Sequence, residues 1–466
     1  MTQDNTPADM SWLGQDIRRA RRQGTEGLAR RQRARLADAV ARARAGSPYY
    51  RDLYRGLPRR VDDPALLPVT DKRRLMERFD DWSTDREITY DNIRAFVDDP
   101  EQIGRPFLGR YMVATTSGTS GRRGLFVLDD RYLNVGAALM SQALTTWLGP
   151  SGILRAAARG GRFAQLVAVG GHYVGFAGNR RAAREGGWRN KILRVFSVHT
   201  PLPELVAQLN AYRPAVIIGY TSTIMLLTAE REAGRLTIDP VLLQPAGETM
   251  TTADVNRTAA AFGGRTAVRT AYGATECTYL SYSCAQGWYH VNSDWAVVEP
   301  VEADYRPTPP GQYSHTVLVT NLANRVQPFL RYDLGDSVLL KPTPCRCGSP
   351  LPAIRVQGRA GDILTFPGAS GEEVRLSPLA LSTLFDRTPG VELFQVVQTA
   401  PSVLRVRLRL TGGALPDEVW GSVETELKVL SADNNLGELT IVRAPEPPQQ
   451  SPGGKYRTVI PLSEGS

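Results

Sequence analysis

A ten-residue run rich in hydroxyls and glycines restricts the folds open to this chain more than any other feature. Residues 115–124 read Thr-Thr-Ser-Gly-Thr-Ser-Gly-Arg-Arg-Gly and directly follow the strand-like segment Tyr111 to Ala114. Glycine lets the backbone approach a ligand closely, and successive N–H groups with Ser and Thr hydroxyls can surround phosphate oxygens. The run is not a Walker A loop, because no Gly-Lys-Ser/Thr closes it. It therefore predicts either a phosphate-binding loop after a strand or an ordinary surface loop.

The length and composition indicate a globular protein with a substantial core. The chain has 466 residues, 42% hydrophobic and 22% charged, which is enough for two or three domains. No segment approaches eighteen uninterrupted apolar residues, so no membrane span is expected. The polar start, Met1 to Asp9, lacks the basic and then apolar layout of a signal peptide. Four cysteines are too few for a disulfide framework, which favours a reducing cytoplasm.

The formal net charge of +9 lies largely in the arginine-rich segment from Arg18 to Arg44. Apolar Leu28, Leu36 and Val40 recur there at near-helical spacing, which predicts an amphipathic helix with a solvated basic face. Aromatic residues are not interleaved with the arginines and no nucleic-acid motif is present, so we do not expect nucleic-acid binding.

Apolar runs alternate with helix-like segments between residues 111 and 335. The pattern predicts strands at 165–169, 215–219 and 267–271 and helices at 203–212 and 222–235, as in an α/β fold with a buried sheet. After about residue 361 the pattern changes to a small α+β module. Its predicted elements are an alternating strand, Val403 to Leu410, and a helix, Pro416 to Leu430.

Lysine is rare in this chain. Only five of the 56 basic residues are lysines, and Lys455 directly follows the Pro/Gly-rich loop 444–454. A chain that uses arginine for nearly every positive charge can keep lysine where a compact ammonium is needed. Lys455 is thus a candidate functional residue carried by a mobile segment.

Five short motifs follow one another along the chain. They are the run 115–124, Tyr272-Gly273-Ala274-Thr275-Glu276, Arg331-Tyr332-Asp333-Leu334-Gly335-Asp336, Gly358-Arg359-Ala360-Gly361-Asp362 and Gly453-Gly454-Lys455-Tyr456-Arg457. In this order they resemble the motifs of the ANL superfamily of adenylate-forming enzymes. Segments 47–51, 67–72, 318–322 and 345–348 are similar to those of its phenylacetate–CoA ligase-like branch. The resemblance covers nearly the whole chain and implies an α/β fold: a large N-terminal adenylation domain with mixed sheets, residues 1–360, and a small mobile α+β C-terminal domain, residues 361–466.

The resemblance implies that a carboxylate attacks the α-phosphate of ATP, giving an acyl-adenylate and pyrophosphate. The residues implied to hold the β- and γ-phosphates are Thr116, Ser117, Gly118, Thr119, Ser120 and Gly121. Thr275 is expected to contact the α-phosphate and Glu276 to bind Mg²⁺, a hard cation that suits a carboxylate. Lys455 is expected to bridge the attacking carboxylate and the α-phosphate as negative charge builds.

The nucleoside is expected to lie against a second group of residues. Tyr272, Gly273, Ala274, Gly247 and Glu248 are implied to line the adenine pocket. Asp336 is implied to accept hydrogen bonds from both ribose hydroxyls, with Arg359 near the same sugar. The structural alternatives are a core tyrosine at Tyr272 and a turn aspartate at Asp336.

The chain departs from the family pattern at the hinge, where Gly361 replaces the usual Asp or Lys. Glycine can adopt both backbone states of a domain rotation but favours neither. The sequence therefore leaves open whether the rotation that prepares other members for CoA thioester formation occurs here.

Three cysteines and a histidine form a candidate metal site. Cys284 and His290, six residues apart, and Cys345 and Cys347, separated by one residue, offer one imidazole and three thiolates. This closed set suits a structural Zn²⁺, and a similar set is familiar from the branch. The alternative is four unrelated reduced groups. Cys277 is interpreted as a small packing residue.

The acid is expected to lie between the segment containing Gly171, His172 and Tyr173 and a second wall at Tyr220. Aromatic and small residues mixed with hydroxyls suit a flat aryl or arylacryl acid. His172 would either orient the carboxylate or be a buried histidine bonded to the backbone.

Three functions remain open. The first is an aryl or arylacetic acid–CoA ligase; the second hands the acyl group to an amine or a carrier protein. The third is a diazotase that activates nitrite for an aryl amine. A nucleotide-binding regulator without turnover would need neither Lys455 nor Glu276. A homodimer is compatible with the sequence, which does not determine the oligomeric state.

Overall fold

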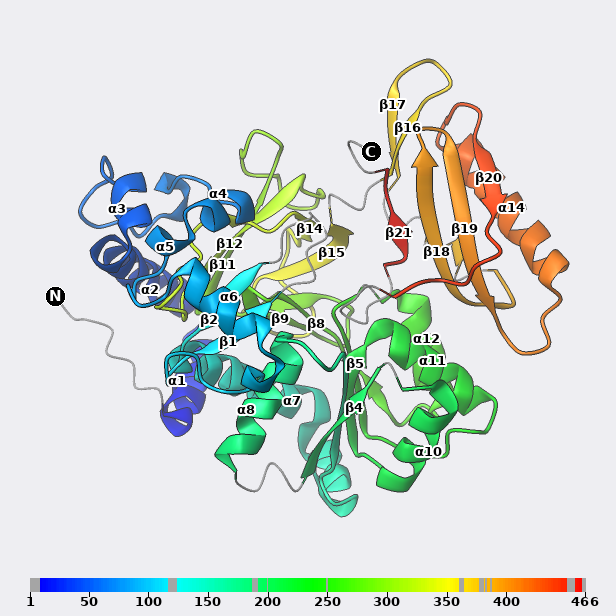
Figure 1. Ribbon diagram of the computed structural model, residues 1–466, viewed down its shortest axis with the longest axis horizontal. Helices are drawn as coiled ribbons and strands as arrows, with labels where there is room; N and C mark the ends of the chain where they lie inside the picture. Colours follow the sequence, from blue (N-terminus) through cyan, green and yellow to red (C-terminus); the bar gives the residue numbers. More distant parts are fainter. Residues whose placement is uncertain are drawn as a thin grey trace.

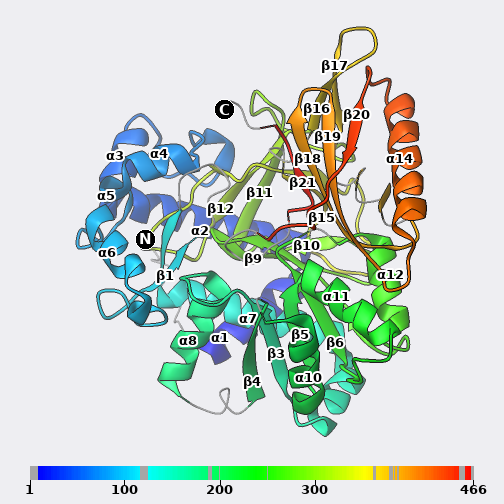
Figure 2. The same cartoon turned by 45° about the vertical axis from the view of Figure 1, so that its right-hand side comes forward.

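The computed structural model describes residues 9–115, 124–186, 192–198, 200–248, 250–359, 364–376, 381, 384–385, 388–450 and 457–462. Figures 1 and 2 show three groups of elements: N-terminal helices, a central region of sheets, and a C-terminal module above α11 and α12. Among the described residues, none of the helices combines the length and the apolar character needed to cross a bilayer.

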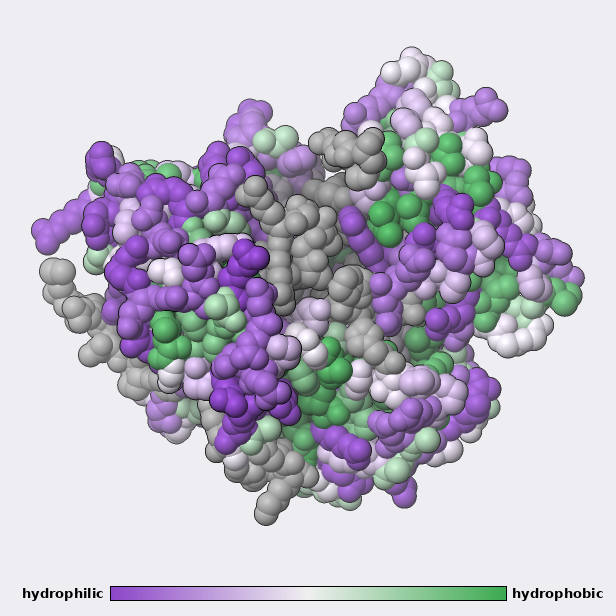
Figure 3. All heavy atoms as spheres, in the orientation of Figure 1, coloured by the Kyte–Doolittle hydropathy of each residue, from purple (hydrophilic) through white to green (hydrophobic). Residues whose placement is uncertain are grey.

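The first hundred described residues contain helices joined by turns and loops. The helices are α1 (Met10–Arg22), α2 (Gly24–Gly46), α3 (Pro48–Leu53), α4 (Lys72–Glu77), α5 (Phe79–Trp82) and α6 (Tyr90–Asp98). The helix predicted within Arg18 to Arg44 is confirmed from Gly24 onward, since Leu28, Leu36 and Val40 are buried residues of α2. The part before Gly24 belongs to a separate helix, and Gly24 has a φ of 67°, in the left-handed region that favours glycine. Hydrophilic side chains dominate the surface over α3 and α4 (Figure 3).

The predicted basic face of these helices is solvated only in part. Arg35 in α2 is 7% exposed and donates to the Asp16 carboxylate of α1 at 2.7 Å and to the carbonyl oxygen of Asp294 at 2.6 Å. Its guanidinium also lies 3.5 Å from the ring centre of Trp295. Sequence periodicity placed Arg35 in solvent, whereas the tertiary contacts provide buried carboxylates that pair with it.

The central parallel sheet has the order β4-β3-β5-β6-β7. Its strands are β3 (Phe163–Val167), β4 (Leu193–Ser197), β5 (Val216–Tyr220), β6 (Leu242–Ala246) and β7 (Ala267–Val268). Helices α10 (Leu202–Tyr212) and α11 (Thr221–Glu232) pack on one face through residues such as Ile217. The kinked helix α7 (Asp130–Ala158) packs on the other through residues such as Val216. Burial on both faces explains the continuous apolar runs.

The predicted strand at 267–271 is divided between two sheets. Ala267–Val268 forms β7 of the parallel sheet, and Ala271 begins β8 (Ala271–Ala274) of an antiparallel sheet. That sheet has the order β14-β15-β10-β9-β8, with β9 (Cys277–Ser283), β10 (Tyr289–Val291), β14 (Asp336–Leu340) and β15 (Ala353–Arg359). A further antiparallel sheet contains β11 (Ala296–Val301), β12 (Thr316–Asn321) and β13 (Tyr332–Asp333).

Residues 364–459 form a hydrophobic core of their own. A hairpin of β16 (Leu364–Pro367) and β17 (Glu373–Leu376) accompanies a four-stranded sheet of order β20-β19-β18-β21. Its strands are β18 (Val391–Ala400), β19 (Val403–Leu410), β20 (Thr440–Arg443) and β21 (Val459–Ile460), and α14 (Pro416–Asp433) packs against the sheet. The predicted strand at 403–410 and the predicted helix from Pro416 are therefore confirmed.

The C-terminal module meets the parallel-sheet region where β18 contacts α11. Glu392 of β18 lies in the field of Glu230, Arg235 and Arg257 from the N-terminal part. Burial raises the pKa of Glu392, Glu230 adds to this rise, and Arg409, Arg257 and Arg235 oppose it. This contact between the two parts therefore holds a carboxyl group whose charge is unfavourable there.

Candidate active site and metal centre

The carboxyl ends of β3 and β5 lie side by side where the order of the parallel sheet changes direction. The chain runs from β3 outward to β4, returns to β5 on the other side of β3, and continues to β6 and β7. Ligands of open α/β sheets bind outside the carboxyl ends of strands at such a switch point. The segment that follows β3 contains Gly171, His172 and Tyr173, and Tyr220 is the last residue of β5.

His172 is connected to the strand that precedes the hydroxyl-rich run. The backbone N–H of Thr115, the last residue of β1 (Met112–Thr115), donates to the carbonyl oxygen of His172 at 2.8 Å. The His172 side chain is 2% exposed, and its ring lies 5.4 Å from that of Phe96. Gly171 is close-packed, since an added Cβ would lie 2.8 Å from the Tyr173 ring.

Tyr220 and Glu248 form the adjacent wall. Burial raises the pKa of Tyr220 to about 12, so its phenol is neutral at physiological pH. The Glu248 carboxylate accepts hydrogen bonds from the N–H of Ser222 at 2.7 Å and from its hydroxyl at 3.1 Å. Ser222 lies in the first turn of α11, so Glu248 caps that helix, where negative charge is favourable. Gly247 precedes it with a φ of 78°.

Tyr272 and Asp336 come together from the two outer strands of the antiparallel sheet. The Tyr272 hydroxyl donates to the Asp336 carboxylate at 2.7 Å, although β8 and β14 are the edge strands. In a flat sheet four strand spacings would separate them by roughly 19 Å. The sheet must therefore curl to bring its edges together, which sequence spacing could not reveal. On β15, Arg359 pairs with Asp336 through the backbone ladder.

Thr275 and Glu276 form the two-residue turn between β8 and β9, with Ala274 paired to Cys277. The Glu276 side chain is 7% exposed, and the Tyr332 hydroxyl donates to its carboxylate at 3.0 Å. The Asn321 side chain donates to the Glu276 carbonyl oxygen at 2.8 Å.

Sequence reasoning missed the residues that hold this turn. Tyr332 and Asn321 lie within the quoted motifs, but nothing in their spacing indicated contact with Glu276. Tyr132 of α7 accepts from the N–H of Thr278 at 2.9 Å, and its hydroxyl lies 3.3 Å from the Thr275 carbonyl oxygen. Cys277 is buried, as expected of a packing residue.

Several predicted site residues lie outside the described part of the chain. These are Thr116, Ser117, Gly118, Thr119, Ser120, Gly121, Gly361, Lys455 and the side chain of Arg359. The described strands β1 and β2 (Leu125–Leu128) pair antiparallel on either side of the hydroxyl-rich run.

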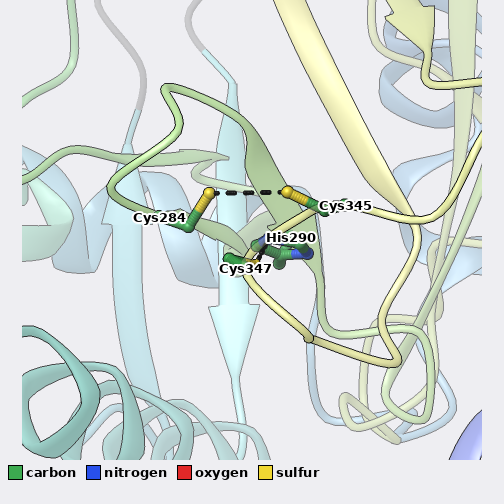
Figure 4. Close-up of side chains that lie close together, drawn as sticks. All are labelled: Cys284, His290, Cys345 and Cys347. Atoms are coloured by element: carbon green, nitrogen blue, oxygen red, sulfur yellow. Dashed lines mark hydrogen bonds between the residues drawn. The ribbon is translucent and has the colours of Figure 1, made fainter.

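The predicted metal ligands are brought together, as Figure 4 shows. The ligand atoms of Cys284, His290, Cys345 and Cys347 all lie within 4.8 Å of one another. The Cys284 and Cys345 sulfurs are 3.9 Å apart, close to the separation of about 3.8 Å for tetrahedral ligands 2.3 Å from zinc. The four residues come from the end of β9, from β10 and from the loop before β15.

The tautomer of His290 suits metal binding. Its Nδ1 lies 3.2 Å from the carbonyl oxygen of Leu351, which can only accept, so Nδ1 carries the proton. Nε2 therefore presents its lone pair to the Cys347 sulfur, 3.1 Å away. A hydrogen bond from the ring nitrogen that does not bind the metal orients metal-binding histidines. Burial lowers the pKa of His290, which keeps the ring neutral.

The fold is shared with solved adenylate-forming enzymes. A 2-hydroxyisobutyryl-CoA ligase in its postadenylation state with 2-HIB-AMP matches with a TM-score of 0.66 and 18% identity, over 94% of this chain and 89% of that one. An anthranilate CoA ligase with anthranoyl-AMP matches with a TM-score of 0.51 and 12% identity, over 74% and 65%. An amide bond synthetase from Marinactinospora thermotolerans matches with a TM-score of 0.50 and 14% identity, over 74% and 67%.

This chain has the ANL fold. No family model and no curated protein matches the sequence, so the structural likeness alone shows it. The resemblance in motif order and the mixed α/β architecture expected from it are thereby confirmed at the level of the fold.

The same 2-hydroxyisobutyryl-CoA ligase was also solved in its thioesterification state with 2-HIB-AMP and CoA. That structure matches with a TM-score of 0.55 and 20% identity, over 95% of this chain and 91% of that one.

Proposed function

We propose that the chain is an ATP-dependent, AMP-forming ligase that adenylates a carboxylic acid and transfers the acyl group to CoA. The main support is three features of the described residues: the segment after β3 and the end of β5 at the switch point, the bonded pair Tyr272–Asp336, and the Thr275–Glu276 turn. Solved proteins with this fold were determined with acyl-AMP or with CoA. Residues 1–360 and 361–466 would act as two domains that move relative to each other.

The nucleotide would be held by residues on both sheets. Asp336, already fixed by Tyr272, would accept from the ribose hydroxyls, with Arg359 beside the same sugar. Tyr272, Gly273, Ala274, Gly247 and Glu248 would line the adenine pocket, with the Glu248 carboxylate held by the start of α11. Residues 116–121 would hold the outer phosphates.

Glu276 is the residue that would hold Mg²⁺. Its carboxylate is largely buried and oriented by the Tyr332 hydroxyl, which suits a hard cation with oxygen ligands. The ion would offset charge on the phosphates, while Thr275 in the same turn contacts the α-phosphate. Lys455 would neutralise the charge that builds as the acid attacks.

The acid would occupy the space between His172 and Tyr220. The aromatic rings of Phe96 and Tyr173 and the neutral phenol of Tyr220 favour an aryl, arylacetic or arylacryl acid. His172 would orient its carboxylate. The acceptor is proposed to be CoA; an amine, a carrier protein, or nitrite with an aryl amine are the competing chemistries.

A panel assay tests this function. Pyrophosphate release would be measured over aryl acids, and over nitrite with aryl amines, each with and without CoA. We expect release with an aryl acid and AMP formation that depends on CoA. Release that requires nitrite, or acyl transfer to an amine without CoA, would replace the CoA assignment.

Lys455→Ala tests the catalytic assignment. The variant should lose acid-dependent pyrophosphate release and still bind ATP. Lys428→Ala is the matched control, because Lys428 lies in the same C-terminal module and forms an ion pair with Glu424, four residues away on α14, at 2.6 Å. Adenylation by Lys455→Ala at the rate of this control would remove the proposed role.

Cys284, His290, Cys345 and Cys347 are proposed to hold a structural Zn²⁺. Three thiolates and one imidazole, whose ligand atoms all lie within 4.8 Å of one another, would form a closed site with no position for substrate. The ion would cross-link β9 and β10 to the loop before β15. Metal analysis of purified protein should find about one zinc ion per chain, and its absence would refute the site.

A further inference from the structure

The amide oxygen of Gln244 is buried in the central parallel sheet without a hydrogen bond. Gln244 lies in β6, and its side chain is 3% exposed. Within the described part of the chain, no group donates to its Oε1. An amide oxygen can accept two hydrogen bonds, and burying it without any costs free energy. A buried acceptor that the fold leaves unpaired therefore requires an explanation.

Strand register places Gln244 on the face of the sheet that is not covered by α10 and α11. Leu243 packs in the core that contains α10 and α11, whereas Leu242 packs in the core that contains α7. Side chains two positions apart share a face, so Gln244 points to the same side as Leu242. Its register partner on β5 is Ile218, whose partner on β3 is Gln165. These three side chains form a row across adjacent strands.

The row is uncovered at its centre. β5 lies between β3 and β6 (Figure 2), yet Ile218 is partly exposed, whereas Val216 on the same face is buried. On one side, α8 (Val174–Glu185) packs closely on β3, since a Cβ added at Gly175 would lie 3.1 Å from the amide nitrogen of Gln165. On the other side, β8 contacts β6. Accessible space therefore remains over Ile218, between α8 and β8.

This space adjoins the proposed acid site. Tyr220, the proposed wall of that site, ends β5 two residues after Ile218, and Tyr173 directly precedes α8. Two residues of a strand span about 6.6 Å, so Gln244 lies deeper along the sheet than Tyr220. An acid whose carboxylate is oriented by His172 at the carboxyl ends of the strands would extend toward Gln244 with its other end.

The two amides of the row differ in their bonding. The Oε1 of Gln165 accepts from the Asn179 side chain of α8, which also donates to the carbonyl oxygen of Gly175 at 2.9 Å. The protein itself therefore holds Gln165, whereas the oxygen of Gln244 is left for a ligand. Because this oxygen can only accept, the ligand group opposite it must carry an O–H or an N–H.

We propose that Gln244 determines substrate specificity by accepting a hydrogen bond from a hydroxyl or amino group at the end of the acid remote from its carboxylate. This inference rests on the proposed function and narrows its substrate class to hydroxy- or amino-substituted aryl acids. A site that hydrogen-bonds a substrate hydroxyl rejects the analogue without it, because the polar group of the site is then left unpaired.

Matched acids test the assignment. Pyrophosphate release would be compared for benzoic, phenylacetic and cinnamic acids and for their hydroxy, amino and methoxy derivatives, substituted at the meta or para position. The methoxy acids control for size, because an ether oxygen cannot donate. Wild type should use a hydroxy or amino acid with a kcat/KM at least about tenfold above those of the unsubstituted and methoxy acids. Equal or higher kcat/KM for acids without a donor would overturn the proposal.

Gln244→Met tests the residue itself, because it removes the amide at similar volume. The variant should lose kcat/KM for the hydroxy and amino acids and keep that for the unsubstituted acids. The preference for acids with a donor should therefore fall to within about twofold, since the group that distinguished them is gone. A preference as large in Gln244→Met as in wild type would refute the role of Gln244.

Urea denaturation tests the unpaired amide without any substrate. Gln244→Met removes an acceptor that the folded protein leaves unpaired, so the variant should be at least as stable as wild type. Gln398→Met is the matched contrast: Gln398 is 4% exposed and donates to the carbonyl oxygens of Thr365 at 2.7 Å and Pro401 at 3.0 Å, so its loss should destabilise. A Gln244→Met variant that is destabilised as much as Gln398→Met, or that does not fold, would show a structural role and overturn the proposal.

The outcomes separate this inference from the proposed function. Adenylation of aryl acids by wild type without regard to a donor would refute the role of Gln244 and leave the proposed function supported. Absence of pyrophosphate release with every acid would refute the proposed function itself.

Discussion

Gly273→Ala is the substitution whose effect the structure specifies most directly. Gly273 lies in β8 at a register irregularity, two residues before the Thr275–Glu276 turn. A Cβ there would lie 2.7 Å from the carbonyl oxygen of Thr278, 2.8 Å from that of Cys277 and 2.9 Å from the Thr278 carbonyl carbon. All three atoms belong to the backbone of β9, so no rotamer change relieves the contact.

The distance that β9 must move determines how large the effects on stability and on rate should be. Ordinary contacts of a Cβ begin at 3.4 Å, so β9 must move away by about 0.7 Å. Overpacking of this kind costs roughly 1–3 kcal/mol of folding free energy. The same movement displaces Thr275 and Glu276, and a misplacement of about 1 Å can reduce a rate by about 10²-fold. We therefore expect the adenylation rate to fall by roughly 10- to 100-fold.

Urea denaturation and pyrophosphate release would be measured side by side on Gly273→Ala and Gly412→Ala. Gly412 has no atom within 4 Å of an added Cβ, and neither glycine has a φ in the left-handed region. The control should stay within about 0.5 kcal/mol of wild type. A Gly273→Ala variant as stable and as active as the control would refute the steric reasoning, and the stability measurement decides this even without a known acid.

Three further predictions concern charge and metal. The pKa of Glu392 is raised in the folded protein, so protonation of this group stabilises the fold. This stabilisation is complete below the ordinary pKa of 4.5 and is lost as pH rises through the raised pKa. Glu392→Gln should remove the loss, so its melting temperature should fall less than that of wild type between about pH 5 and 8. Cys284→Ser should abolish zinc content, whereas Cys277→Ala should retain it, and equal zinc in both would contradict the ligand set. Arg35→Met leaves the buried Asp294 carboxylate without its guanidinium, while Asp16 keeps the guanidinium of Arg31. The substitution should cost about 3–5 kcal/mol in chemical denaturation, and a cost below 1 kcal/mol would contradict a buried network.

The sequence indicated the elements whose pattern is local. Alternation predicted β19 with the same bounds, and continuous apolar runs predicted β3 and β5, because a strand buried on both faces needs apolar residues at every position. The cysteines and the histidine predicted as a metal site do lie close together.

Predictions that depended on partners far along the chain were less complete. The segment at 267–271 read as one strand because periodicity does not show where a chain leaves one sheet for another. Arg35 read as solvated because Asp16, Asp294 and Trp295 are brought to it by folding alone. The same holds for Tyr332 beside Glu276, which are 56 residues apart in the sequence.

The sequence by itself predicted the kind of chemistry, through the order of its motifs and through residue types suited to phosphate, nucleoside and metal binding. Only the tertiary structure decided which groups act on one another: Tyr272 with Asp336 across a curled sheet, and Glu248 with the start of α11. The reason is physical. Local pattern reports which face of an element is buried, whereas hydrogen bonds between side chains depend on the curvature and packing that bring distant elements within 3 Å.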